Sequence, residues 1–400
     1  MDDKRVRKNP FTEYPIRHAL LIVAIILLGS YYFLREVRAA ADFVTVYITQ
    51  PWHRLAGTVF GFVPFSVAEW LCVLAMLSVL VYVIVTIILV IRKPDKLRRV
   101  YAASISIFAA TLMAYSLLCW LWGIGFYSNT LTELSGIETE EVSVEELKAV
   151  TLYFAEKANK AADSVNRDED GIFVCDVDRI LREAPALYTN LPKEFDFLKG
   201  PYSVPLSGSQ SGSQSGSQSS PQSSPQSKPH SQPKPMFFSY IYSHMGFTGF
   251  FFPLTGEANI NVHAPHCFIP STVAHELAHQ YGITREQDAN FIAVMVCMES
   301  DDADFVYSGA LLAYVYLASA LKKASYEDWL EVSSYLDDSV KKDLTAHSKY
   351  WEQFDTPINQ ISEGAYEGFL QNQGQELGMR SYGACVDFLV AYYGAEAKKH

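Results

Sequence analysis

Three long runs of apolar residues in the first third of the chain restrict its fold more than any other feature. They lie at roughly residues 18–34, 66–91 and 101–125. A helix that crosses the hydrocarbon core of a bilayer needs about 20 apolar residues, and the second and third runs exceed that length. The first run is shorter but has basic and aromatic flanks, and LREVR follows it in place of a signal-peptide cleavage site. We therefore expect three transmembrane helices in a membrane domain of residues 1–126.

Lysine and arginine are unevenly distributed around these runs, and this predicts their orientation. Basic residues are dense before the first run and between the second and third, whereas the loop between the first two has few. Dense clusters stay in the cytoplasm, so we expect a multi-pass protein of the cell membrane with a cytoplasmic N-terminus and an extracytoplasmic C-terminal domain. The two clusters are Lys4, Arg5, Arg7, Lys8 and Arg17, and Arg92, Lys93, Lys96, Arg98 and Arg99.

A fourth apolar run lies at roughly residues 305–321 and reads FVYSGALLAYVYLASAL. It is shorter than the others and contains Ser308, Gly309 and several tyrosines. A stretch of this length and polarity is more typical of a buried core helix than of a membrane span. We expect it to lie in the core of the later part of the chain.

Charge and cysteine content exclude two classes of function. The formal net charge is −12, and most of the acid lies beyond the membrane runs, so no nucleic-acid partner is expected. The six cysteines include no CxxC pair, which argues against a zinc cluster built on cysteine. The four cysteines of the later part could form one or two disulfides or remain buried thiols.

The region after the membrane runs divides into three parts. Residues 127–205 are expected to be helical, since Ser143 and Glu146 form a capping-box pattern before an amphipathic stretch. Residues 206–235 are rich in Ser, Gly, Gln and Pro and are predicted to be a disordered insertion, either a long loop in one domain or a linker between two. Residues 236–400 form the predicted catalytic part.

The segment Gly249–Val262 is rich in aromatic and β-branched residues and predicts one or two strands with a turn at Leu254–Gly256. Helices are expected to dominate from Pro270 to the end. The fold class predicted for the whole chain is therefore α+β and mostly α.

The most informative motif is His275-Glu276-Leu277-Ala278-His279, an HExxH sequence. On a helix, positions i and i+4 lie one turn apart on the same face, so both imidazoles can bind one Zn²⁺. Glu276 then lies beside the metal, where it can take a proton from a zinc-bound water and later return one to a leaving amine. The motif predicts a zinc cofactor held by His275 and His279, with Glu276 as the general base.

A catalytic zinc site needs a third protein ligand. Gly282 is expected to end the metal-binding helix, and Thr284 to cap a second helix that follows at once. Because the chain reverses at Gly282, Glu286 in the first turn of that helix can fold back towards the metal and is the preferred third ligand. The rivals are Asp288 and, more weakly, His263 and His266.

These motifs resemble the glutamate-zincin metallopeptidases, in which a glutamate on a second helix completes an HExxH site. Residues 286–293, EQDANFIA, look like their E-x-x-A-[ND] helix, and the resemblance favours Glu286 over Asp288. The gap between His279 and Glu286 is much shorter than in most such enzymes. The turn at Gly282 is instead similar to the metzincin HExxHxxGxxH arrangement, with Arg285 where their third histidine stands, so the subfamily is left open.

The outline of three N-terminal membrane helices followed by GFFFPLTGEANIN and HELAHQYGITREQDANF resembles an uncharacterised family of bacterial membrane proteins regarded as metallopeptidases. This resemblance implies a zincin-like fold and names no substrate. In zincins an edge strand binds the substrate backbone, and the segment Gly249–Val262 is the candidate for that role. Glu257 could orient a ligand histidine, although a surface salt bridge is the simpler interpretation.

A metallopeptidase also needs a donor for the developing oxyanion. Tyr366, Arg380 and Tyr382 are the candidates in the C-terminal stretch, and Tyr382, beside Gly383 in a predicted loop, is the preferred one.

The resulting hypothesis is a membrane-anchored zinc metallopeptidase that hydrolyses peptide or protein substrates, with Glu276 and Tyr382 as catalytic residues and the lipid bilayer as its other partner. The alternative is a zinc-binding membrane sensor or scaffold without catalysis. Intramembrane proteolysis is disfavoured because QYGITREQD follows the motif where an apolar span would be required.

Overall fold

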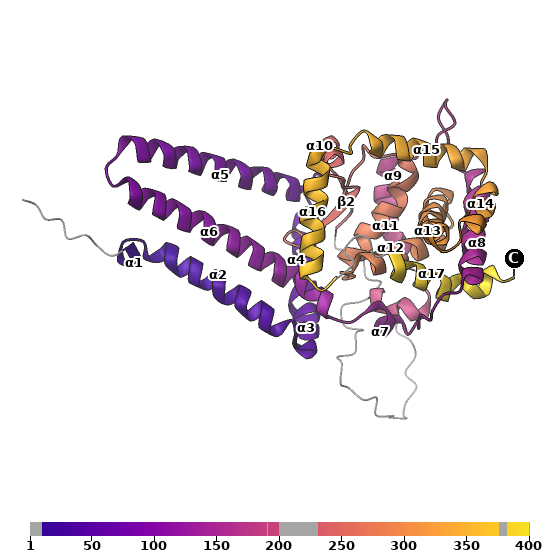
Figure 1. Cartoon of the computed structure of the whole chain (residues 1–400), viewed down its shortest axis with the longest axis horizontal. Coiled ribbons are helices and arrows are strands. Elements are labelled where there is room, and N and C mark those ends of the chain that lie inside the picture. The colour runs from indigo at the N-terminus through magenta and orange to yellow at the C-terminus, as the bar shows by residue number, and fades with distance from the viewer. Residues whose placement is uncertain (1–9, 190, 200–230, 376–381, 400) are drawn as a thin grey trace, which may run out of the picture.

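The computed structural model describes residues 10–189, 191–199, 231–375 and 382–399. It is mostly helical, with few strands, and has several long apolar helices near the N-terminus, as expected of a membrane protein. Figure 1 shows an elongated helical bundle at one end and a compact outer part at the other. Most of the predicted insertion, residues 206–230, lies outside the described residues.

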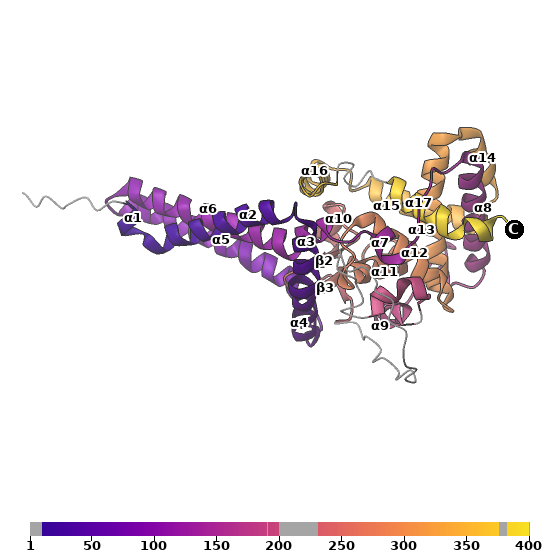
Figure 2. The same ribbon diagram turned by 90° about the horizontal axis from the view of Figure 1, so that it is seen from below.

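The bundle consists of α2 (Pro15–Leu34), α5 (Val67–Arg92) and α6 (Lys96–Leu121), preceded by the short α1 (Pro10–Glu13). All three bundle helices are long and apolar enough to cross a membrane, and they match the three predicted runs. Figures 1 and 2 both show them side by side, with the outer part at one end. The α5 helix begins where Ser66 accepts a hydrogen bond from the Glu69 amide, which is a standard N-cap.

Between α2 and α5 the chain forms three consecutive helical segments that the sequence interpretation did not foresee. They are α3 (Arg38–Val44), the π-helical η1 (Thr45–Thr49) and α4 (Gln50–Gly61). In both views α3 and α4 lie at the end of the bundle where it meets the outer part. We call residues 38–62 the junction segment.

The outer part is a helical assembly around α13 (Ala303–Ala324), which packs against α8 (Val144–Ala162), α12 (Glu286–Met298) and α17 (Tyr382–Ala397). The capping box predicted at Ser143 and Glu146 is present at the start of α8. The burial of α13 confirms that the fourth apolar run is a core helix. The other helical segments are η2 (Gly123–Tyr127), α7 (Leu131–Ser135), α9 (Val177–Glu183), η3 (Ala184–Tyr188), η4 (Lys193–Lys199), α10 (Ser239–His244), η5 (His266–Phe268), α11 (Ile269–Gln280), α14 (Tyr326–Ser334), α15 (Asp338–Glu352) and α16 (Pro357–Asn372).

One small sheet of three strands occurs among the described residues, in the order β1-β3-β2. The antiparallel hairpin of β2 (Gly249–Phe252) and β3 (Glu257–Ile260) confirms the predicted strands and turn, and Gly256 has the positive φ of 66° that the turn requires. The strand β1 (Lys234–Pro235) pairs in parallel with β3. The last two residues of the predicted insertion, Lys234 and Pro235, therefore belong to the folded sheet. The Lys234 side chain is buried there and pairs with Glu257.

Two buried carboxylates join this sheet region to the start of α5. Glu257 accepts hydrogen bonds from the amides of Val67 (3.1 Å) and Ala68 (2.9 Å) and pairs with Lys234 at 2.5 Å. Glu69 accepts from the amides of Phe237 (2.8 Å) and Phe238 (3.0 Å). Glu257 is thus neither a surface salt bridge nor a partner of a ligand histidine, which corrects both interpretations. Its charge is stabilised by the N-terminus of α5.

The six cysteines are free thiols, five of them buried, so the buried-thiol alternative describes this structure.

Candidate metal centre

The HExxH motif lies on α11, and its apolar positions explain why this segment is helical and central. Val273, Ala274, Leu277 and Ala278 are fully buried on one face. The motif's polar residues occupy the other face, where the rings of His275 and His279 lie 4.6 Å apart, one helical turn from each other.

A sharp reversal follows the motif. Gly282 has a φ of 98°, which favours glycine, and a side chain there would collide with Gln50 of the junction segment. The next helix, α12, begins at Glu286 with Arg285 as its N-cap residue. Thr284 is therefore not the cap, which corrects the prediction; its side chain packs against Gly125 instead. The reversal turns Glu286 back towards the histidines.

Three potential ligands converge at this point. Glu286 Oε2 lies 3.2 Å from His275 Nε2 and 3.6 Å from His279 Nε2. Among the described residues, these three form the group whose donor atoms, all within 4.8 Å of one another, could hold a metal ion. His279 Nδ1 lies 2.7 Å from the carbonyl oxygen of Ile283, so Nδ1 carries the hydrogen and Nε2 is free to act as a ligand.

Glu276 is held beside this group in a nearly dry environment. Its side chain is 4% exposed, and burial raises the pKa of Glu276 to about 7 against the lowering effect of the two histidines. A Cβ at Gly249 of β2 would lie only 2.6 Å from Glu276 Oε1, so the strand passes directly over the carboxylate. Glu276 therefore lies between the histidine pair and the edge strand of the sheet.

The electrostatics of the group are those of a cation site. Burial alone would lower the pKa of His279, but the adjacent Glu286 carboxylate reverses this and raises it to about 9. Burial would raise the pKa of Glu286, but His279 and His275 outweigh it and hold that pKa well below its ordinary value. In the described part of the chain, His275 Nδ1 and Glu276 Oε2 are buried without a hydrogen-bond partner. A charged carboxylate, two imidazoles and unpartnered polar atoms fit a divalent metal such as zinc.

Tyr366 of α16 also reaches the candidate site. Its hydroxyl donates a hydrogen bond to Glu286 Oε1 at 2.5 Å. Burial and the neighbouring carboxylates raise the pKa of Tyr366, so the hydroxyl keeps its proton and remains a donor. Tyr382 is the first residue of α17, so the predicted loop at this position is wrong. The side chain of Tyr382 and the whole of Arg380 lie outside the described residues.

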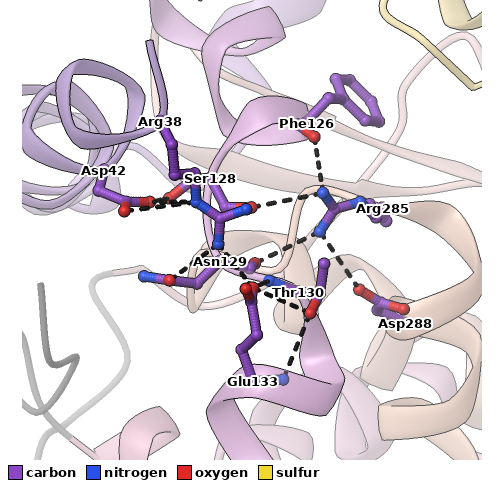
Figure 3. Close-up of polar contacts among 9 residues, drawn as sticks. All are labelled: Arg38, Asp42, Phe126, Ser128, Asn129, Thr130, Glu133, Arg285 and Asp288. Carbon is purple, nitrogen blue, oxygen red and sulfur yellow. Dashed lines mark hydrogen bonds and ion pairs between the residues drawn. The ribbon is translucent and has the colours of Figure 1, made fainter. Parts of the chain in front are cut away.

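The rival ligands lie elsewhere. Figure 3 shows Asp288 facing Arg285, and the ion-pair atoms of the two side chains are 4.0 Å apart. Arg285 donates hydrogen bonds to the carbonyl oxygens of Phe126 (2.7 Å), Ser128 and Asn129. Arg285 therefore holds the chain that leaves α6, and it does not occupy a ligand position. Among the weaker candidates, His263 contacts Tyr350 and His266 accepts a hydrogen bond from the Cys175 amide.

Trp122 completes the surroundings, and no sequence motif indicates its role. Its ring contacts His279 edge to face, with 5.1 Å between centroids, and also packs on Phe251 of β2. Trp122 follows α6 directly, so the end of the third bundle helix lies against His279 of the candidate site. The only signal in the sequence is its position at the end of an apolar run.

The comparisons with known proteins give one match. The model of a family described as "Protein of unknown function (DUF3810)" matches residues 45–390, which includes the whole site. No curated protein and no solved structure matches the chain.

Proposed function

The chain belongs to this DUF3810 family, and we propose from the site itself that it is a membrane-anchored zinc metallopeptidase. The observation that carries the proposal is the convergence of His275, His279 and Glu286 within 4.8 Å, with the carboxylate of Glu276 beside them. Three protein ligands leave one position open, and an acid–base group stands next to it. That combination is typical of hydrolytic zinc sites and not of structural ones.

The surroundings support a zincin-like arrangement. The helix that bears HExxH lies under a small sheet whose β2 strand is its edge, and a second helix supplies the glutamate. An edge strand offers free amide and carbonyl groups to an extended peptide. A substrate paired with β2 would have its backbone next to Glu276, because Gly249 lies against that carboxylate.

Each residue of the site would have a separate role in peptide hydrolysis. When bound, a zinc ion supplies a Lewis acid that polarises the carbonyl and acidifies the attacking water. Glu276 would take a proton from the attacking water and return one to the leaving amine. Tyr366, whose hydroxyl donates to Glu286 Oε1 in this structure, would turn that donor to the oxyanion that forms on the substrate. His279 is oriented for its role by the carbonyl of Ile283.

The test of the mechanism is Glu276→Gln in the full-length protein in detergent, assayed with a mixture of random-sequence peptides read by mass spectrometry. Cleavage should fall at least about 100-fold, since the general base is lost, while the zinc content is unchanged. Glu327→Gln, an exposed glutamate on α14, is the matched control. Cleavage that persists in Glu276→Gln contradicts the mechanism.

The alternative of a zinc-binding sensor or scaffold predicts a different metal environment. X-ray absorption on the zinc-loaded full-length protein should show three protein ligands and one water. Four protein ligands would favour a structural site and the non-catalytic alternative.

We also propose that the outer part is extracytoplasmic. The short loop between α5 and α6 carries the basic cluster around Arg92–Arg99 and lies at the far end of the bundle from the outer part. Basic loops are retained in the cytoplasm. A C-terminal tag should therefore be accessible in intact cells, and protection of the tag would reverse the orientation.

A further inference from the structure

The exposed side of the junction segment is apolar, which is unusual for a surface helix. The side facing the protein is mixed: alongside apolar residues such as Ala41 and Val46 it buries Asp42, Thr45, Thr49 and His53, all at most 6% exposed. The side facing out is mostly apolar, and the one charged residue between positions 43 and 62, Arg54, is half-buried. A surface helix in water shows the opposite pattern. The exposed large apolar residues are Phe43 (53%), Tyr47 (46%), Ile48 (52%), Trp52 (40%), Leu55 (59%), Val59 (54%) and Phe62 (86%).

The buried polar side chains of the segment form hydrogen bonds with groups at the end of the bundle. Thr49 donates a hydrogen bond to the Trp120 carbonyl at 3.2 Å, and His53 Nε2 lies 2.9 Å from the Leu121 carbonyl oxygen. Figure 3 shows Arg38 of α3 bound to Asp42 in the same helix and to Asn129 and Glu133. Asn129 and Glu133 belong to the stretch after α6 that Arg285 also contacts. The polarity is therefore built into the packing of the segment and is not an accident of exposed side chains.

The position of the segment in the membrane follows from its neighbours. It begins just after α2 ends at Leu34 and ends just before α5 starts at Val67. Both bundle helices have these ends beside the outer part, so both ends of the segment lie at one face of the bilayer. An apolar helix face at that level, continuous with two membrane spans, is immersed in the bilayer interface. The aromatic side chains Tyr47 and Trp52 suit that depth.

The inner side of the same segment touches the metal centre. The His53 ring lies 5.0 Å from that of Phe251 in β2, and Gln50 abuts Gly282 at the end of the metal helix. A side chain at Gly256, in the β2–β3 turn, would strike the His53 carbonyl at 2.2 Å. One layer of side chains therefore separates the bilayer interface from the strand and helix that build the site.

We infer that the junction segment is an in-plane anchor in the outer face of the bilayer, and that it holds the site at the membrane surface so that the substrates are polypeptides tethered to the same membrane. This inference rests on the proposed peptidase function for its substrate class. The depth of the anchor does not depend on that function. A polypeptide held by a lipid or a membrane span presents its first residues at this height, where a soluble peptide has no advantage.

The depth is tested with spin labels on the full-length protein in vesicles of phosphatidylcholine and phosphatidylglycerol. Labels at Leu55→Cys and Val59→Cys, in a Cys72→Ser background, should collide more with oxygen than with a water-soluble nickel complex. Leu330→Cys on α14 is the control, because Leu330 is also exposed (49%) but lies at the far end of the outer part. Labels at 55 and 59 that behave like the label at 330 overturn the anchor.

The substrate class is tested in the same vesicles with a pool of random peptides joined to a diacyl anchor through spacers of different length. A spacer of about three residues reaches only about 10 Å from the surface, and one of about 15 residues reaches about 50 Å. The tethered pool should be cleaved at least about tenfold faster than the free pool, with the short spacer sufficient. The double variant Leu55→Glu, Val59→Glu should lose this advantage and still cleave the free pool in detergent.

The outcomes separate the two proposals. Equal cleavage of tethered and free pools, or cleavage only with the long spacer, overturns the substrate class while the peptidase function stands. Cleavage of neither pool by the unchanged protein overturns the peptidase function and the substrate class together. In that case the spin labels still decide the position of the anchor.

Discussion

The helices α5 and α13 are both long and apolar enough to cross a membrane, yet they meet opposite surroundings. None of the most apolar stretch of α5 is buried within the protein, whereas 67% of the corresponding stretch of α13 is. The α5 helix packs against α6 and exposes leucine, isoleucine and valine over the rest of its surface, whereas α13 packs among α8, α12 and α17. Hydropathy measures how strongly a segment avoids water, and the tertiary structure determines whether lipid or protein replaces the water.

The comparison is tested most severely by placing the same polar side chain in each helix. Leu311 of α13 is fully buried and Leu80 of α5 is 54% exposed. Leu311→Asn should lower the free energy of unfolding of the outer part by about 4 kcal/mol, since it removes packing and buries an amide. Leu80→Asn should change it by less than about 0.5 kcal/mol. Thermal unfolding of the full-length protein in detergent measures both, and equal losses would mean that α5 is also a core helix.

The outer part and α5 should also differ in how their stability depends on pH. Burial lowers the pKa of His347 in α15 to about 4, below the unfolded value of about 6.5. As the pH falls below 6.5 the unfolded state takes up a proton first, so the outer part loses up to about 3 kcal/mol by pH 4 and little more below it. The stability is fully present above pH 6.5. Denaturant titrations across this range should show the slope, and His347→Gln should flatten it.

The apolar stretch of α5 contributes no such response. Residues 71–91 of α5 include no histidine and no formally charged side chain. A slope that survives in His347→Gln would place the titrating group elsewhere in the protein.

The smallest expected difference involves two helical glycines. A Cβ at Gly309 of α13 would lie 2.5 Å from Cys297 Cβ of α12, whereas a Cβ at Gly29 of α2 meets nothing within 4 Å. Gly309→Ala should cost about 1–2 kcal/mol, because the overpacking outweighs the gain in helix propensity. Gly29→Ala should be neutral within about 0.5 kcal/mol. Thermal unfolding of the two variants side by side checks the prediction; a neutral Gly309→Ala would show that α12 and α13 can separate at no cost.

Local patterns in the sequence were enough to locate the ligand group. HExxH, Gly282 and Glu286 lie within 12 residues of one another, so helix periodicity and one turn predict their arrangement. The apolar runs likewise predict the bundle helices, because a span is a property of one continuous segment.

Long-range contacts could not be predicted in this way. Tyr366 is one of 24 tyrosines and lies 80 positions from Glu286, so nothing local distinguishes it from Tyr382. Lys234 stands at the end of a low-complexity stretch, and only its pairing with Glu257 shows that it is buried. The junction segment has helical spacing, but its sequence does not say which face meets the protein.

The buried pair of Lys234 and Glu257 limits how this protein can be divided. Two of the lysine's hydrogen bonds go to the carbonyls of Phe60 and Phe65, and the glutamate receives the amides at the start of α5. A fragment cut after residue 126 would retain both charges and lose those partners. The outer part and the bundle are therefore one folding unit, and they must be expressed and purified together.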